Sequence, residues 1–536
     1  MQILRLYSLT LIILLAGSNL NLCFGQGLNE LQVDSLATKN LRLFKVPGLA
    51  IGIIKDGKLV YKKGFGVNSV ITNEKTNSNT LFGIASNTKA FTAAALGILV
   101  DDSKIKWDDK VTAYIPEFKM YDAYATREMT IRDLLIHHSG LATGAGDLMH
   151  DPDSTNFTVK DIIYNLRYIK PTYSFRSKFA YDNNLYLVAG EVISRVSKMT
   201  WENFIEKRIL RPLKMDQSSA SFNGLKVRNN IIDPHKVING SVNVIARYAS
   251  AKDDAAGGIY SNIDDLSKWL LMLMNNGRFG QNLGQQLLST QVTHELLAPQ
   301  MIISGGNGGV YGNHFQAYGL GWFLIDSKGY KQIVHTGEDV GMVSEVLMIP
   351  EIGLAVIVLT NNESNAISAI TDQIVDSYLH IDGVDESKNN LERLTKNELA
   401  ESNAKREVWG AVNDQYKNSF AELKNFTGTY HNAWFGDVSI KNHQGFMYFA
   451  SKRSLQLRGL LHYYKKDCYV IKWENPEINA DTFLTFKNKK GYTTFELLSA
   501  TPVSGFNYDG MNFKKEIILI PGLVKKFKIK ASAQIK

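Results

Sequence analysis

The feature that most constrains the fold is a change of pattern near residue 382. Before it, apolar strand-like runs stand at both ends of a long region, with helical segments between them. After residue 417 there are only short β-rich runs, separated by Gly, Asn or Lys turns. Because 536 residues exceed what one hydrophobic core usually supports, we predict two domains. The charged, helix-prone segment 382–417 is predicted to be a helical linker between them.

The first domain is predicted over residues 26–381 as an α+β fold. Two apolar runs meet at Asp56 and Gly57, which is a hairpin signal. Since strand-like runs occur at both ends of this region, we expect one antiparallel sheet, assembled from distant segments and flanked by helices. Within the region, Ser261 is expected to cap an amphipathic helix, and Asp264 would complete a pattern like a capping box.

The second domain is predicted over residues 418–515, and a basic tail over 516–536. Evenly spaced short β-rich runs are typical of a small barrel or sandwich. Aromatic side chains fill the inside of such a barrel, so we expect them in its core rather than in a ligand-binding box. The residues in question are Trp434, Phe435, Tyr448 and Trp473.

The net charge of +8 is concentrated at the C-terminal end. Seven lysines and one glutamate between Lys514 and Lys536 contribute +6, which leaves only +2 for the other residues. There is no arginine-rich stripe, zinc-finger spacing or RNA-binding signature, so we do not expect nucleic-acid binding. The tail could contact an anionic surface such as a membrane.

Residues 1–25 are predicted to be a secretory signal peptide. They combine an early positive charge, a short apolar stretch and small residues, and we expect cleavage after Gly25. An uncleaved membrane anchor and a lipidated Cys23 are alternatives, although Leu22 is a poor residue to precede a lipidated cysteine. We therefore expect an exported protein, periplasmic or secreted. Cleavage would leave Cys468 as the sole cysteine, which excludes an intramolecular disulfide.

The most distinctive chemical pattern is Ser86 followed three residues later by Lys89, where an alanine-rich apolar run begins. One helical turn would place both side chains on the same face. Burial would lower the lysine pKa, and a helix start would favour negative charge at the serine oxygen, so the pair forms an activated nucleophile. The same spacing recurs in charged segments at Ser103 and Ser402. A simple helix cap at Ser86 is the alternative interpretation.

A nucleophile also needs groups that move protons and hold the developing oxyanion. Tyr181 and Asn183 precede an apolar helix, so both could project from a loop into a cleft. The Tyr-x-Asn pattern also occurs at four other tyrosines and is weak by itself. His335 and Gly337 lie at a predicted strand end, where glycine would let a substrate backbone approach closely.

His137 and His138 fall near a predicted helix end, with Gly140 as its C-terminal cap. We interpret them as helix-terminus residues rather than metal ligands, because no other histidine lies at metal-binding spacing from them. Neither a metal nor an organic cofactor is expected.

Three short motifs follow one another along the chain: Ser86-x-x-Lys89, Tyr181-x-Asn183 and His335-x-Gly337. As a set they resemble the motifs of the serine β-lactamase and penicillin-binding protein superfamily, specifically its class C β-lactamase-like branch. The resemblance extends over about residues 30 to 380 and includes the stretches RDLLIHHSGL, AAGGIYSNIDDL and YGLGWF. It implies a β-lactamase/DD-peptidase-like fold and a serine hydrolase.

Carried onto this chain, the resemblance implies that Ser86 attacks a carbonyl and forms an acyl-enzyme. Lys89 and Tyr181 would shuttle the proton, and Asn183 would hydrogen-bond the substrate amide. The backbone N–H groups of Ser86 and Glu338 would form the oxyanion hole. The Glu338 carboxylate would be unfavourable beside an oxyanion unless it points away.

The resemblance also shows two departures from class C β-lactamases. His335, in the substrate-binding motif with Gly337, stands where they usually have lysine, and Asp182 replaces their serine. Because histidine is largely neutral at pH 7, a fixed cation for a substrate carboxylate is lost. We therefore expect an esterase or a D-amino-acid peptidase or amidase. A β-lactamase proper and a non-catalytic protein that binds cell-wall peptides are the alternatives.

The C-terminal runs, including FTGTYHNAWFGDVSI, resemble the lipocalin-like barrel that is often appended to hydrolases of this branch. We expect this domain to restrict access to the cleft or to aid assembly.

Overall fold

A computed structural model describes residues 27–516 except 153–154, 227, 239, 248–251, 309–310, 476–477, 479–480, 490, 502–506 and 509. The predicted signal peptide and all but the first residue of the predicted tail lie outside the described residues. No helix in the described part of the chain is long and apolar enough to cross a membrane.

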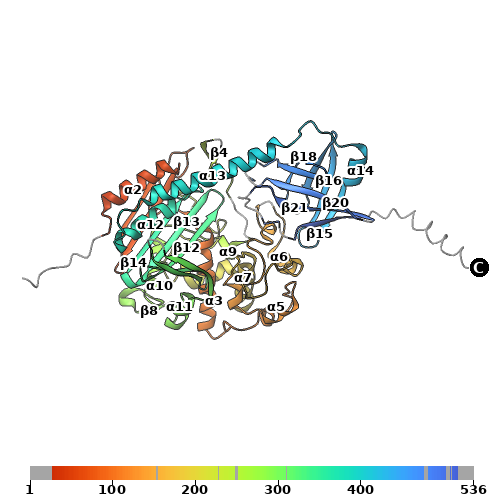
Figure 1. Ribbon diagram of the computed structural model, residues 1–536. Helices are drawn as coiled ribbons and strands as arrows, with labels where there is room; N and C mark the ends of the chain where they lie inside the picture. The colour runs from red at the N-terminus through yellow and green to blue at the C-terminus, as the bar shows by residue number, and fades with distance from the viewer. Residues whose placement is uncertain are drawn as a thin grey trace, which may run out of the picture.

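Eight of the described strands form one antiparallel sheet, in the order β2-β1-β14-β13-β12-β11-β10-β9 (Figure 1). The hairpin of β1 (Gly48–Lys55) and β2 (Lys58–Gly66) turns at Asp56 and Gly57, as predicted. β1 pairs with β14 (Leu354–Thr360), so the two ends of the domain meet in the sheet. The α+β prediction is confirmed. The remaining strands are β9 (Met301–Gly308), β10 (Asn313–Tyr318), β11 (Phe323–Ser327), β12 (Tyr330–Asp339) and β13 (Met342–Ile349).

Helices cover both faces of this sheet. On one face, α2 (Glu30–Leu43) and α12 (Ala366–Leu379) pack apolar side chains against β1 and β14. On the other, α10 (Ile263–Met274) contacts β1, β2 and β14 and leads into a larger helical layer. The other helices of this domain are α3 (Thr88–Asp101), α4 (Val111–Tyr114), α5 (Ala123–Glu128), α6 (Val159–Asn165), α7 (Asn184–Ser197), α8 (Trp201–Ile205), α9 (Asp254–Gly257) and α11 (Thr290–Leu296).

Three pairs of short strands complete this domain. β3 with β6 and β7 with β8 are two-residue ladders, and β4 with β5 is slightly longer. Their bounds are β3 (Phe82–Gly83), β6 (Tyr260–Ser261), β4 (His235–Ile238), β5 (Ser241–Val244), β7 (Arg278–Phe279) and β8 (Gln285–Gln286).

The predicted cap of α10 was wrong by one residue. Asn262, not Ser261, is the N-cap, and its side chain accepts a hydrogen bond from the backbone N–H of Asp265. Ser261 is instead the last residue of β6, paired with Phe82 in β3. Because this pairing holds Ser261 in an extended conformation, the helix begins after it.

The helix predicted to end at His137 and His138 was also wrong. The segment forms only a single 3₁₀ turn, η3 (Arg132–Leu134). His137 has a φ of 58°, in the left-handed region, so the helix cannot continue through it. Gly140 has a positive φ as well, but it turns the chain beside the backbone of Tyr173 instead of capping a helix.

The C-terminal part is a closed barrel of eight described strands, as predicted (Figure 1). The helix α13 (Glu386–Gly410) runs from the first domain to this barrel, which α14 (Phe420–Phe426) precedes. The strands are β15 (Gly428–Asn432), β16 (Gly436–His443), β17 (Phe446–Ser451), β18 (Arg458–Lys465), β19 (Cys468–Trp473), β20 (Thr482–Lys489), β21 (Tyr492–Ser499) and β22 (Asn512–Lys515).

The aromatic residues of the barrel divide into two groups. Trp434 and Phe435 are buried in the core, as predicted. Tyr448 and Trp473 are only partly buried, and the Tyr448 hydroxyl donates to a carboxylate on the barrel surface. Cys468 is buried and forms no disulfide.

Candidate active site

Ser86 lies in a single 3₁₀ turn, η2 (Ala85–Asn87), immediately before α3. The preceding Ala85 has a φ of 45°, a left-handed conformation that costs energy for a residue with a Cβ atom. Ser344 of β13 supports the turn, because its Oγ donates to the carbonyl of Ile84 at 2.8 Å and accepts from the Asn87 amide at 2.8 Å. The turn is thus fixed to the sheet, and the Ser86 side chain remains partly exposed.

Lys89 follows in the first turn of α3 and is 0% exposed. Its Nζ donates to Ser86 Oγ at 3.0 Å, to Asn183 Oδ1 at 2.8 Å and to the carbonyl of Ala256 at 3.0 Å. Burial lowers the pKa of Lys89 to about 7, although nearby carboxylates oppose that shift. A substantial fraction of the amine is therefore neutral near pH 7 and can accept a proton from Ser86.

Tyr181 and Asn183 come from the loop before α7, so two distant segments converge on Lys89. The Tyr181 ring centroid lies 4.9 Å from Lys89 Nζ. Burial raises the pKa of the Tyr181 hydroxyl, and a hydrogen bond with Ser86 opposes that rise. Tyr181 is consequently protonated near neutral pH and placed to pass a proton to or from Ser86.

His137 is a site residue that the sequence interpretation missed. Its ring stacks on Tyr181, with centroids 4.1 Å apart, and its Nδ1 accepts from the backbone N–H of Asp182 at 3.1 Å. Burial lowers the pKa of His137, so the ring is neutral and acts as an acceptor. His137 stands in the stretch HHSGL, but no spacing in the sequence connects it to Tyr181.

His335 lies on β12 and is buried beside the tyrosine loop. Its Nε2 shares a hydrogen bond with the Tyr318 hydroxyl at 2.9 Å, and its Nδ1 lies 2.6 Å from the carbonyl of Thr336. Burial, together with the positive charge of Lys89, lowers the pKa of His335 to about 3. It therefore supplies no positive charge near neutral pH.

Gly337 brings β12 against the turn that carries Ser86. A Cβ atom at this position would lie 2.0 Å from the carbonyl oxygen of Ile84 and 2.7 Å from Ser344 Oγ. The glycine is thus needed for the approach of the chain's own backbone, a reason that the sequence did not reveal. The next residue, Glu338, has an exposed side chain, because successive side chains of a strand alternate between faces.

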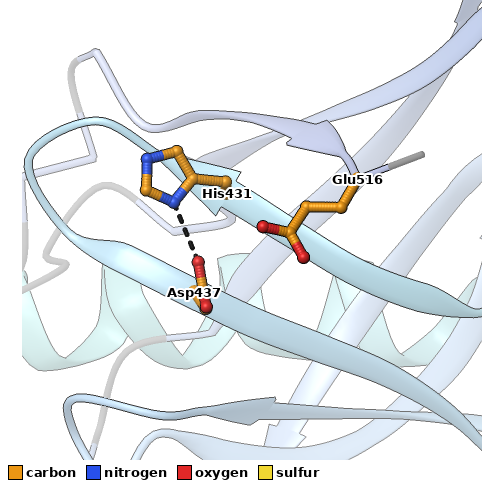
Figure 2. Close-up of side chains that lie close together, drawn as sticks. All are labelled: His431, Asp437 and Glu516. Carbon is orange, nitrogen blue, oxygen red and sulfur yellow. Dashed lines mark hydrogen bonds and ion pairs between the residues drawn. The ribbon is translucent and has the colours of Figure 1, made fainter. Parts of the chain in front are cut away.

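Within the described part of the chain, one group of side chains has the proximity that a metal ion needs. His431, Asp437 and Glu516 lie together on the barrel, with ligand atoms within 4.8 Å of one another (Figure 2). Asp437 also pairs with Lys452 at 3.0 Å, and this positive charge opposes a bound cation. None of the predicted site residues belongs to the group, and we assign no site to it.

The geometry places Ser86, Lys89, Tyr181 and Asn183 together, and comparison with known proteins identifies the family. The sequence model described as Beta-lactamase matches residues 35–377. The chain belongs to the β-lactamase family. This is a family of serine hydrolases, so the predicted superfamily and enzyme class are confirmed. A second model, described as a domain of unknown function (DUF3471), matches residues 414–515, which include the barrel.

Two curated relatives illustrate how far the sequence similarity reaches. "Protein flp" of Staphylococcus aureus (strain MRSA252) is 25% identical over 350 residues, covering 65% of this chain and 66% of that protein. The "Unguisins hydrolase ungD'" of Aspergillus campestris is 24% identical over 365 residues, covering 64% of each chain. The chain thus spans slightly less than two thirds of the length of these relatives.

Two solved structures share the fold. An octameric penicillin-binding protein homologue from Pyrococcus abyssi aligns with a TM-score of 0.57 and 22% identity, over 91% of this chain and 100% of that chain. A penicillin-binding protein from Bacillus halodurans aligns with a TM-score of 0.53 and 21% identity, over 65% of this chain and 98% of that chain. The β-lactamase/penicillin-binding-protein fold is therefore confirmed.

Proposed function

We propose that this chain is an exported serine hydrolase that forms an acyl-enzyme at Ser86 and acts on esters or D-amino-acid peptides. One observation carries the proposal: the buried Lys89 amine lies 3.0 Å from Ser86 Oγ and has a pKa of about 7. A buried amine that titrates near the working pH is suited to general-base catalysis. A serine that served only as a helix cap would not need such a partner.

In the proposed reaction, the Ser86 hydroxyl loses its proton to Lys89 as Oγ bonds to the substrate carbonyl carbon. The backbone N–H groups of Ser86 and Glu338 stabilise the oxyanion. The leaving group then takes up a proton relayed by Tyr181, and the carbon to leaving-group bond breaks. Water attacks the acyl-enzyme in the same way, releases the acid and restores the Ser86 hydroxyl.

The neutral His335 supports the choice of substrate class. A ring with a pKa of about 3 provides no cation for a substrate carboxylate at pH 7, which β-lactams carry. Esters and peptides that are recognised through their amide groups do not need that cation. The sequence similarity to the unguisins hydrolase of Aspergillus campestris supports hydrolysis as the reaction.

The decisive experiment is intact-protein mass spectrometry after exposure to a fluorophosphonate probe. We expect one adduct on the wild type and none on Ser86→Ala. Ser103→Ala is the matched control, because Ser103 has the same spacing to a lysine but is exposed, and this variant should be labelled like the wild type. An unlabelled, well-folded wild type, or equal labelling of Ser86→Ala, would overturn the proposal and favour a non-catalytic binding protein.

Two further measurements define substrate and location. Rates with an ester panel, D-peptides, a penicillin and a cephalosporin should favour the first two classes, whereas rapid β-lactam turnover would assign a class C-type β-lactamase. N-terminal sequencing of the exported protein should begin at Gln26. Protein retained in the cytoplasm would contradict export.

A further inference from the structure

We propose that Asp147 is a positioning residue that orients the Asn183 amide towards Lys89, and that the barrel holds the segment carrying Asp147 in place. This role rests on the proposed function of Ser86 and Lys89. Nothing in the three sequence motifs includes Asp147, which lies between the first and the second of them.

The Asp147 carboxylate contacts the loop that carries Asn183. Its Oδ2 accepts from Asn183 Nδ2 at 2.9 Å, and its Oδ1 accepts from Asn184 Nδ2 at 3.2 Å. A carboxylate can only accept, so the Asn183 amide must direct its NH₂ group towards Asp147. Its carbonyl oxygen is then left to face Lys89, where it accepts from Nζ at 2.8 Å. One carboxylate thus determines which end of the amide the lysine contacts.

The backbone just before Asp147 is also hydrogen-bonded to the loop that carries Asn183. The N–H of Gly144 donates to the carbonyl of Tyr181 at 3.0 Å, and Asn184 Nδ2 donates to the carbonyl of Ala145 at 3.1 Å. The segment that carries Asp147 and the loop that carries Tyr181 and Asn183 are therefore bound to each other at several points. A displacement of the segment would move the loop.

The barrel contacts this segment on both sides of Asp147. Before it, Asn507 Nδ2 donates to the carbonyl of Thr143 at 2.6 Å. After it, the N–H of Asn156 donates to the carbonyl of Arg453 at 2.8 Å, and the Arg453 guanidinium pairs with Asp161 at 3.0 Å. Figure 1 shows α6, which Asp161 helps to begin, next to the barrel. These contacts give the second domain a structural role at the active site.

The charge of Asp147 also acts on Lys89. After desolvation, Asp147 is the largest influence on the pKa of Lys89, and it raises that pKa. Asp147 itself pairs with His150 at 3.2 Å, and this carboxylate helps to raise the pKa of His150 to about 9. The other titratable groups around Lys89 are Asp182, Asp253, His137, His335, Tyr181 and Tyr186.

Two substitutions separate the charge from the hydrogen bond. Asp147→Asn keeps an acceptor for Asn183 but removes the negative charge, so the pKa of Lys89 should fall and the acid limb of the kcat/KM profile should move to lower pH. Asp147→Leu removes the acceptor as well, and we expect kcat/KM to fall about 10- to 100-fold with a smaller change in KM. Asp147→Glu should return the acid limb towards its wild-type position.

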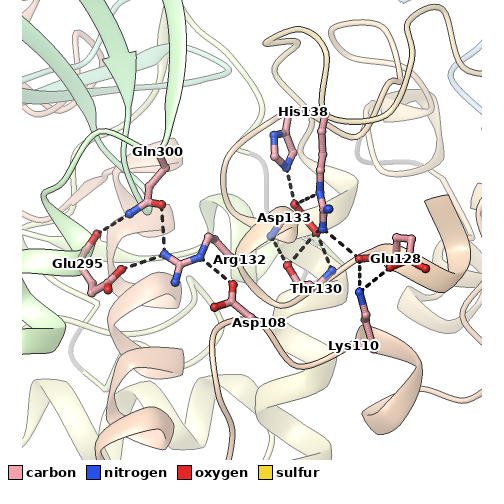
Figure 3. Close-up of polar contacts among 10 residues, drawn as sticks. Asp108, Lys110, Glu128, Thr130, Arg132, Asp133, His138, Glu295 and Gln300 are labelled. Atoms are coloured by element: carbon pink, nitrogen blue, oxygen red, sulfur yellow. Dashed lines mark hydrogen bonds and ion pairs between the residues drawn. The ribbon is translucent and has the colours of Figure 1, made fainter. Parts of the chain in front are cut away.

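Asp133→Asn is the matched control, since Asp133 is another buried carboxylate that contacts no predicted site residue (Figure 3). It should lower the melting temperature and leave the acid limb unmoved. Profiles of Asp147→Asn and Asp147→Leu that superimpose on the wild type would overturn the positioning role. Fluorophosphonate labelling distinguishes the two possible failures. If the positioning role is wrong, the wild type is still labelled, whereas if the proposed function is wrong, the wild type is unlabelled.

Arg453→Met tests the barrel contact without changing a residue of the site. This variant also keeps the proposal testable if Asp147→Leu does not fold. We expect a reduced kcat/KM with an unmoved acid limb, because the segment is loosened but the charges beside Lys89 stay. Wild-type kcat/KM in this variant would overturn the role of the barrel.

Discussion

Two buried charged groups in the helical layer, Lys89 and Asp133, have very different partners. Lys89 makes three hydrogen bonds, all to uncharged oxygen atoms: a hydroxyl, an amide and a backbone carbonyl. Among the described residues, no carboxylate forms an ion pair with it. Its burial is therefore not compensated by a direct countercharge.

The negative charge of Asp133 is compensated by hydrogen-bond donors to both of its carboxylate oxygens (Figure 3). Its two oxygen atoms accept from His138 at 2.5 Å, from the Arg176 guanidinium at 2.9 and 2.6 Å, and from the N–H and hydroxyl of Thr130, both at 2.8 Å. These partners hold the pKa of Asp133 well below its usual range in spite of burial. Its charge is fixed at all moderate pH values.

The two buried groups differ in what fixes their protonation state. A buried charge with direct countercharges is locked in one protonation state and supports the fold. A buried amine that has hydrogen bonds but no direct countercharge titrates near neutral pH. Four experiments test this contrast, beginning with the largest expected effect.

The largest effect is expected for Lys89→Met. It removes the proton acceptor, so kcat/KM should fall by about 10²- to 10⁴-fold. Because the folded-state pKa is about 7 against an ordinary 10.5, Lys89 weakens the folded state increasingly as pH falls from 10.5 towards 7, and fully below that. The variant should consequently melt no lower than the wild type at pH 7. Steady-state kinetics and calorimetry measure both, and a stable variant with normal turnover would break the contrast.

Asp133→Ala should lower stability and leave turnover nearly unchanged, which is the opposite of the result expected for Lys89→Met. Removing this carboxylate leaves the buried His138 ring without its acceptor, whereas Arg176, whose side chain is 40% exposed, can turn to solvent. We expect a cost of about 1–3 kcal/mol in the free energy of unfolding. Turnover per folded molecule should change little, because no predicted site residue contacts Asp133. Urea denaturation combined with active-site titration would check it. Loss of turnover at unchanged stability would show that the two clusters are not separate.

The pH dependence of stability provides a smaller effect with a definite sign. Since the pKa of Asp133 is lowered from 3.8, its contribution is present above pH 3.8 and is lost as pH falls below that value. The free-energy difference between the wild type and Asp133→Asn should therefore shrink on acidification through this range. Urea midpoints measured at a series of acid pH values test it, and a difference that grew on acidification would contradict the assigned sign.

The smallest effect is expected in a neighbouring cluster around Arg132. Asp108 accepts from Arg132 but its side chain is 76% exposed, and Arg132 keeps a second partner in Glu295 at 2.9 Å (Figure 3). Asp108→Ala should change the free energy of unfolding by no more than about 0.5 kcal/mol. Thermal melts in low and high salt would reveal a larger contribution if one exists.

Much of the fold could be predicted from the sequence because the relevant signals are local. The turn at Asp56 and Gly57 and the apolar runs on either side predicted the β1–β2 hairpin correctly. The even spacing of short β-rich runs predicted the barrel. The cap of α10 was misplaced because the pairing of Ser261 with Phe82 brings together residues far apart in the chain. Propensity alone does not contain such a pairing.

The candidate site, too, was predicted from the sequence only in part. Its three motifs were recognised in order, but His137, Asp147 and Tyr318 were not, because each acts through a contact with a residue distant in sequence. The steric role of Gly337 inside the protein was not foreseen either, since the close carbonyl of Ile84 is brought there by the packing of β12 against η2.

The three-residue spacing of Ser86 and Lys89 was enough to place them within one turn of each other, because such a separation leaves little freedom once a helix forms. Tertiary packing, in contrast, is the reason that Lys89 is desolvated, that Asn183 presents its oxygen to it, and that His335 is neutral. A pKa depends on the solvent removed and on the charges and dipoles brought near. Both are products of packing between segments that the chain order keeps apart.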